Sequence, residues 1–161
     1  MSYVNNGSDI YKESFRIIRE EADLARFPAD VERVVVRMIH AAADPAIAGD
    51  IAFTPGVVEA TRRALASGAN ILCDSSMTAT GIIRSRLPEG VQVVCHIKEP
   101  HLAELAKRND TTKTCAAVDL WAAEDHLDGA VVAIGNAPTA LFHLLEAVSY
   151  THLRAHETDS Y

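Results

Sequence analysis

A chain of 161 residues that is 48% hydrophobic and 23% charged has a globular composition and is long enough for one domain with a sizeable core. Its formal net charge of −7 disfavours nonspecific nucleic-acid binding, which needs a basic face, and any acidic ligand must be held by local cations. No apolar run approaches the roughly 18 residues of a membrane span, and the N-terminus lacks signal-peptide features. We therefore expect a cytoplasmic protein that binds neither membrane nor nucleic acid.

Two helices are predicted before residue 45. Ser8 or Asp9 can cap a helix that runs to about Ala25, and Asp30 can cap a second helix that ends before Pro45. In the second helix, apolar residues recur at steps of three and four, which predicts one buried stripe. The stripe consists of Val31, Val34, Val35, Met38, Ile39 and Ala42.

Three polar residues lie beside these apolar positions. Arg37 and His40 are three residues apart, so their side chains are one helical turn from each other and could act on a common ligand. Ordinary structural roles are open as well, because long basic side chains often lie along the edge of a buried stripe. Ser14 falls on the apolar side of the first helix, where a small hydroxyl commonly bonds back to a carbonyl.

From residue 54 onward, helices alternate with short apolar runs. Thr54 and Pro55 resemble an N-cap and first residue of a helix that ends at Gly68. Strands are predicted within residues 70–74, 91–97 and 130–136, and helices within 100–108 and 112–127. Strand and helix in alternation predict parallel pairing, hence an α/β fold: a three-layer α/β/α single domain with a mostly parallel sheet. Trp121 is expected in its core.

Ligands of such sheets bind beyond the carboxyl ends of the strands, here the segments "DSSMTATGI" and "GNAPTAL". Asn136 and Pro138 can begin a helix whose exposed N–H groups would suit a carboxylate or phosphate, although a plain turn has the same sequence. Asp74 could accept hydrogen bonds from a ligand or cap the following helix. Glycine-rich nucleotide motifs are absent from the sequence.

Cysteine and histidine spacing does not predict a metal site. Cys73, Cys95 and Cys115 form no C-x-x-C pair, which also argues against a disulfide framework and fits a reducing compartment. Adjacent residues of a strand point to opposite faces, so Cys95 and His96 could not share a metal there. His101, His126 and His143 have no partner at a ligand spacing within their helices, so no metal is expected.

Five segments together resemble the precorrin-8X methylmutase family. They are "SFRIIREE", "RMIHAAADP", "DSSMTATGI", "TKTCAAV" and "IGNAPTAL", and the resemblance covers about residues 8–148. It implies an isomerase of cobalamin biosynthesis that moves a methyl group from C-11 to C-12 of precorrin-8X, giving hydrogenobyrinate or the cobalt-containing equivalent. It further implies an α/β homodimer that acts on an anionic corrinoid without a separate cofactor, with its active site near the subunit interface.

The resemblance also assigns roles to four residues. It makes His40 the catalytic proton donor and gives Ser14 and Arg37 contacts to the substrate. Lys113 stands where the family is expected to have an arginine that reaches the substrate; lysine keeps the charge but loses the planar fork that binds a carboxylate through two bonds. A methyl shift on a conjugated ring needs no nucleophile, but it needs a proton, which histidine supplies near neutrality.

The resemblance ends near residue 148. The family continues there with a glycine-rich segment and a further strand, whereas residues 149–161, "SYTHLRAHETDSY", lack apolar periodicity. We expect residues 1–148 to form a methylmutase domain that is incomplete at its C-terminus and residues 149–161 to be foreign to the fold. The alternative function is therefore a catalytically incomplete fragment that binds corrinoids.

Overall fold

The computed structural model describes residues 5–124 and 127–158, with the side chains of residues 150–158 excepted. Its contacts divide the chain between Ala60 and Thr61 into two compact units. Each unit has hydrophobic packing of its own. None of the helices in the described ranges is both long and apolar enough to cross a membrane.

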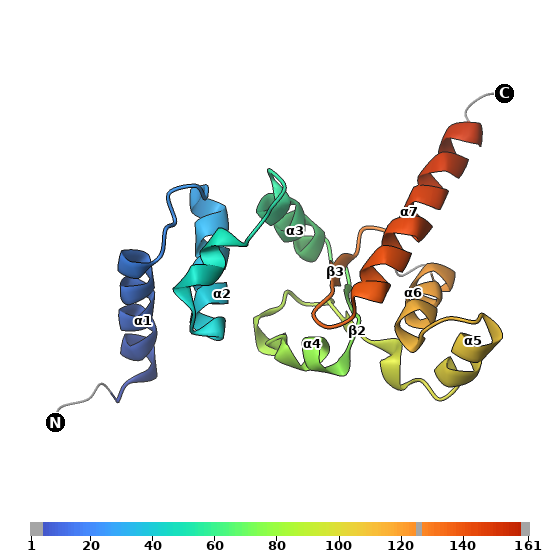
Figure 1. Cartoon of the computed structure of the whole chain (residues 1–161), viewed down its shortest axis with the longest axis horizontal. Helices are drawn as coiled ribbons and strands as arrows, with labels where there is room; N and C mark the ends of the chain where they lie inside the picture. The colour runs from blue at the N-terminus through green and yellow to red at the C-terminus, as the bar shows by residue number, and fades with distance from the viewer. Residues whose placement is uncertain (1–4, 125–126, 159–161) are drawn as a thin grey trace. The chain divides into compact units, whose positions relative to one another are not determined.

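The first unit is built on two packed helices, α1 (Gly7–Glu21) and α2 (Ala29–Ala42), followed by a short 3₁₀ turn, η1 (Pro45–Gly49) (Figure 1). The hydrophobic core between these elements contains Ile18, Phe27, Val31, Val35, Val36, Ile39 and Ala48. Each residue is at most 7% exposed, so burial of this apolar surface stabilises the packing of the helices.

The N-caps of these helices differ from the predicted ones. Asn6 caps α1, because its side chain accepts hydrogen bonds from the backbone N–H groups of Ser8 and Asp9, which lie inside the first turn. Pro28 occupies the cap position of α2 without a side-chain hydrogen bond. Asp30 lies in the first turn of α2, where its negative charge is attracted to the positive end of the helix dipole and stabilises the helix.

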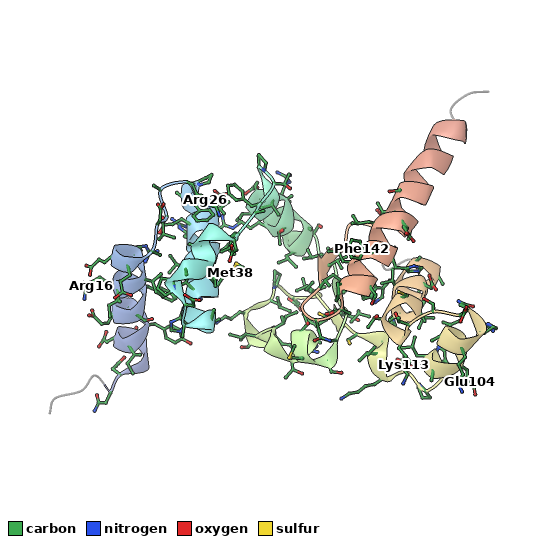
Figure 2. All side chains as sticks on the ribbon, in the orientation of Figure 1. Arg16, Arg26, Met38, Glu104, Lys113 and Phe142 are labelled. Atoms are coloured by element: carbon green, nitrogen blue, oxygen red, sulfur yellow. The ribbon has the colours of Figure 1, made fainter. Side chains whose placement is uncertain are left out.

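The buried stripe of α2 is narrower than predicted. Val31, Val35 and Ile39 repeat at steps of four and are buried together with Val36. Val34 and Met38 are both 44% exposed. Each precedes a buried residue of this stripe by one position, which places its side chain at the outer edge of the buried face. Ala42 is exposed as well. Figure 2 labels Met38 on α2.

Helix α3 (Val57–Ala66) begins later than expected and ends as expected. The N–H of Val57 donates to the carbonyl of Thr54, and Gly56 has a φ of +80°, so residues 54–57 form a turn in place of a cap. At the other end Gly68 adopts a φ of +85°, which confirms the predicted C-terminal glycine.

The second unit contains a three-stranded parallel sheet in the order β2-β1-β3. Its strands are β1 (Ile71–Cys73), β2 (Val93–Val94) and β3 (Val131–Ala133), which confirms the predicted strand positions. β2 is shorter than predicted, because the chain turns at His96 into the 3₁₀ turn η3 (His96–Lys98). The other elements are α4 (Ser76–Gly81), η2 (Arg84–Arg86), α5 (Leu102–Arg108), α6 (Lys113–Ala123) and α7 (Pro138–Thr158).

Alternating residues of β1 separate two layers of helices. Leu72 packs with Val118 and Trp121 of α6 on one face of the sheet. Ile71 and Cys73 pack on the opposite face with α3 and α4. The arrangement confirms the three-layer α/β/α architecture and the burial of Trp121, which is 0% exposed.

Helix α7 begins at Pro138, as predicted, and runs without interruption to Thr158. The boundary placed at residue 148 therefore falls inside a helix. It stays a prediction, as does the foreign origin of residues 149–161, part of which lies outside the described residues.

Candidate functional site

The first unit brings together three of the four residues to which the sequence assigns a role. Ser14 Oγ and His40 Nδ1 share a hydrogen bond of 2.8 Å between α1 and α2, although the residues are 26 positions apart. Both side chains are half-buried. Arg37 lies one turn before His40 on α2, with an exposed side chain.

The hydroxyl of Ser14 is suited to a histidine that changes its protonation state. A hydroxyl donates to a neutral Nδ1 and accepts from a protonated one, so the contact persists in both states. In either state Nε2 can carry a proton, and no described residue forms a hydrogen bond with it. The alternative in which Ser14 bonds back to a helix carbonyl is wrong, because its hydroxyl is directed at the imidazole.

Aromatic rings surround His40. The ring centroid of Tyr11 is 5.0 Å from that of His40, at an interplanar angle of 39°, and Phe15 meets the imidazole edge-to-face at 5.4 Å and 89°. The guanidinium carbon of Arg37 lies 5.5 Å from the centre of the Phe15 ring. Sequence reasoning missed Tyr11 and Phe15; the signal was their spacing from Ser14, since residues 11, 14 and 15 share one helical face.

An apolar groove of about 320 Å³ borders the same serine. It is lined by Ile10, Glu13, Ser14, Ile17 and Ile18 of α1. Its surface is almost entirely hydrocarbon, so it favours an apolar surface over a strongly hydrated group. Ser14 therefore stands between the imidazole and an apolar surface.

Lys113 belongs to the second unit. It is the first residue of α6 and is exposed, with Thr112 capping the helix by accepting from the N–H of Cys115 at 3.1 Å (Figure 2). Its charge is available to an anion, and its contact with the substrate stays a prediction.

The expected anion site at the start of α7 is filled by a carboxylate of the chain itself. Asp74, 1% exposed at the end of β1, accepts hydrogen bonds from the N–H groups of Gly135, Asn136 and Ala137 at 3.1, 2.9 and 2.7 Å. Thr78 Oγ1 donates to it at 2.9 Å. The sequence had left Asp74 as a ligand contact or as the cap of α4; Ser75 is that cap, and Asp74 binds the β3–α7 loop.

The pKa of Asp74 reflects opposing causes. Burial disfavours the charged carboxylate and raises the pKa, but the hydrogen bonds from Gly135, Ala137, Thr78 and Asn136 outweigh burial, so the pKa lies below its usual range. The loop is also tight: a Cβ on Gly135 would lie 2.5 Å from Thr78 Oγ1. The carboxyl end of the sheet is thus occupied by protein groups at this loop.

The other histidines and cysteines have surroundings of their own. His143 Nε2 lies 2.7 Å from Asp119 Oδ1, a pairing that joins α7 to α6. His126 lies outside the described residues. Burial, with smaller effects of Cys95 and Asp74, raises the pKa of Cys73 to about 11, so its thiol stays protonated at neutral pH. No cluster of three or more potential metal ligands occurs among the described side chains.

Comparison with known proteins identifies the family. A model of the precorrin-8X methylmutase family matches residues 9–156. The precorrin-8X methylmutase of Pseudomonas aeruginosa is 47% identical over 146 residues, which cover 91% of this chain and 69% of that protein. The cobalt-precorrin-8 methylmutase of Methanothermobacter thermautotrophicus is 37% identical over 143 residues, covering 87% of this chain and 65% of that protein.

A solved structure agrees with these relatives. The precorrin-8X methylmutase of Thermus thermophilus superposes with a TM-score of 0.80 at 40% identity, covering 89% of this chain and 69% of that one. The chain thus spans about two thirds of the length of the relatives it matches. From these matches and its α/β architecture, the chain belongs to the precorrin-8X methylmutase family.

Proposed function

We propose that the protein is an isomerase of cobalamin biosynthesis, which moves a methyl group from C-11 to C-12 of precorrin-8X to give hydrogenobyrinate, or acts likewise on the cobalt-containing equivalent. Family membership supports this reaction. The observation that carries it to individual residues is the 2.8 Å hydrogen bond between Ser14 Oγ and His40 Nδ1, which leaves Nε2 for the substrate.

In this reaction His40 is the proton donor. Protonation of the conjugated ring draws electrons toward the protonated atom, so the bond from the methyl group to C-11 breaks while the bond to C-12 forms. Substrate and product contain the same atoms, so the donated proton is balanced by one that the ring releases. Ser14 remains bonded to Nδ1 throughout, because its hydroxyl adapts to either protonation state.

Arg37 and Lys113 bind carboxylates at the edge of the anionic corrinoid. Arg37 forms no ion pair within the described part of the chain, and its planar fork suits two parallel bonds to one carboxylate. Lys113 supplies a point charge without that geometry. The active protein is a cytoplasmic homodimer that uses no separate cofactor and no resident metal.

Replacing the histidine tests this function. His40→Ala should lower kcat for conversion of precorrin-8X by roughly 100- to 10,000-fold, the usual contribution of a general acid, as followed by visible absorbance. Titration with hydrogenobyrinic acid should still show saturable binding. His101→Ala, which removes an exposed histidine in the other unit, is the matched control and should leave kcat unchanged.

Each other outcome has a distinct meaning. Full activity of His40→Ala would contradict the assigned proton donor. Saturable binding of hydrogenobyrinic acid without turnover by the unaltered protein would favour the alternative, a catalytically incomplete corrinoid-binding fragment.

A further inference from the structure

We propose that Phe15 is a positioning residue of this reaction, because its ring holds both the imidazole of His40 and the guanidinium of Arg37 in place. This role rests on the proposed function, in which His40 donates a proton and Arg37 binds a carboxylate. Phe15 touches neither the reacting atoms nor the carboxylate; it acts through the two side chains that do.

The hydrogen bond between Ser14 and His40 does not fix the imidazole by itself. It restrains Nδ1, but the χ2 torsion of histidine has a broad energy minimum, so the ring plane can swing about the bonded atom. Tyr11 and Phe15 contact the imidazole at ring-centroid distances of 5.0 and 5.4 Å. Two rings and one hydrogen bond together determine where Nε2 points.

Among the described residues, Phe15 is the one whose ring contacts both His40 and Arg37. Its ring meets the imidazole edge-to-face at 89° and lies 5.5 Å from the guanidinium carbon of Arg37. A cation above an aromatic face is attracted by the electrons of the ring, and that attraction restricts a flexible side chain. Among the described residues Arg37 has no carboxylate partner, and its guanidinium lies over the Phe15 ring.

The core holds the Phe15 ring itself. Phe15 is half-buried and packs against the cluster that contains Ile18, Val35 and Ile39. A side chain supported by a packed core transmits little of its own motion to its neighbours. Because the core restrains the Phe15 ring, that ring can in turn restrain the side chains of His40 and Arg37.

The test is Phe15→Leu, which keeps an apolar side chain and removes the ring. Displacement of a catalytic group by a fraction of an ångström slows the reaction, so kcat should fall on the order of ten-fold. KM should rise, because Arg37 is then held less firmly in the position that binds the carboxylate. Phe53→Leu is the matched control: Phe53 is also half-buried against the same core, but its ring contact is Phe27. The control should show a comparable fall in melting temperature and an unchanged kcat per folded molecule.

Coupling to Ser14 separates positioning from a general loss of stability. If both residues orient the same imidazole, Ser14→Ala should lower kcat less in the Phe15→Leu protein than in the unaltered one. Fully multiplicative effects on kcat, or a Phe15→Leu protein whose kcat matches that of Phe53→Leu, would overturn the inference.

The His40→Ala variant distinguishes failure of this inference from failure of the proposed function. If His40→Ala is inactive and Phe15→Leu is fully active, the positioning role of Phe15 is contradicted and the proposed proton donor is not. If His40→Ala is fully active, the assignment of His40 as proton donor is contradicted, and so is the positioning role of Phe15 that depends on it.

Discussion

Ser14 has neighbours of two chemical kinds. On one side it bonds to His40 Nδ1, and on the other it lines the apolar groove of α1. A hydroxyl with one hydrogen bond keeps the capacity for another. The predicted contact of Ser14 with the substrate is therefore compatible with its bond to His40, and the serine would then link the proton donor directly to the bound ring.

Arg37 supports a prediction about binding. Arg37→Lys keeps the positive charge but loses both the fork and the flat face that packs over Phe15. We expect KM for precorrin-8X to rise about ten-fold, the loss of one charge-assisted hydrogen bond, with a smaller change in kcat. Arg33→Lys, an exposed substitution on the same helix, is the control in the same steady-state assay. Equal KM values for the two variants would contradict a role of Arg37 in binding.

The grouping of Ser14 with His40 could not be derived from periodicity. Helical spacing places Arg37 near His40, because both lie on α2, and this part of the site follows from local geometry. The contact of Ser14 spans 26 positions and depends on how α1 packs against α2. Only the family resemblance pointed to Ser14, since no local pattern encodes a contact between two helices.

At the scale of elements, the positions of the strands could be predicted, while the exact ends of strands and helices could not. The runs around Ile71, Val93 and Val131 pair in one parallel sheet and are rich in β-branched apolar residues, which makes their positions easy to recognise. Helix starts depend on which of several polar residues adopts the cap conformation. Asn6 does so at α1, although Ser8 and Asp9 are equally suited by type.

The β3–α7 loop and the end of β1 are joined through one carboxylate. Asp74 accepts four hydrogen bonds, three of them from backbone groups 61 to 63 positions away. A carboxylate at the start of a helix also favours the helix dipole. The segment predicted as an anion site thus does bind an anion through its backbone N–H groups, and that anion is the Asp74 side chain of the same chain.

This contact predicts a loss of stability in Asp74→Asn. The amide would point an NH₂ group at backbone donors, so we expect the free energy of unfolding to fall by about 3 kcal/mol. Urea denaturation at pH 7 measures this change, with the exposed Asp128→Asn as control.

The effect should depend on pH. Because the pKa of Asp74 is lower in the folded protein than in the unfolded chain, the contribution is fully present above the unfolded value, about 4, and is lost as pH falls through the folded value. The difference between the unaltered protein and Asp74→Asn should therefore shrink below about pH 4. A constant difference down to pH 2 would contradict the assigned cause.

At the scale of the whole molecule, net charge and ligand charge oppose each other. The chain carries a formal charge of −7, while the proposed substrate bears several carboxylates. The cations assigned to the substrate are local, with Arg37 in the first unit and Lys113 in the second. On this proposal we expect long-range repulsion to slow the encounter and short-range attraction to hold the bound ligand.

Salt should therefore raise both rate constants of binding, each for its own reason. Raising ionic strength from about 20 to about 200 mM shortens the Debye length from roughly 20 to 7 Å, so the association rate constant of hydrogenobyrinic acid should rise. If Arg37 and Lys113 bind the ligand as proposed, the dissociation rate constant should rise too, because salt weakens charge–charge contacts. Stopped-flow absorbance measures both, and a corrinoid whose carboxylates are converted to amides is the control. An association rate constant that falls with salt would show that local cations dominate the encounter.

The carboxylate that joins β1 to the β3–α7 loop also limits how the protein opens. Opening of the β3–α7 loop would leave Asp74 charged and buried with Thr78 as its one remaining donor, and withdrawal of Asp74 would leave three amides without this acceptor. Moving either Asp74 or the loop by itself therefore raises the free energy. The end of the central strand and the start of the last helix are therefore expected to unfold as one cooperative unit, although more than sixty residues of chain separate them.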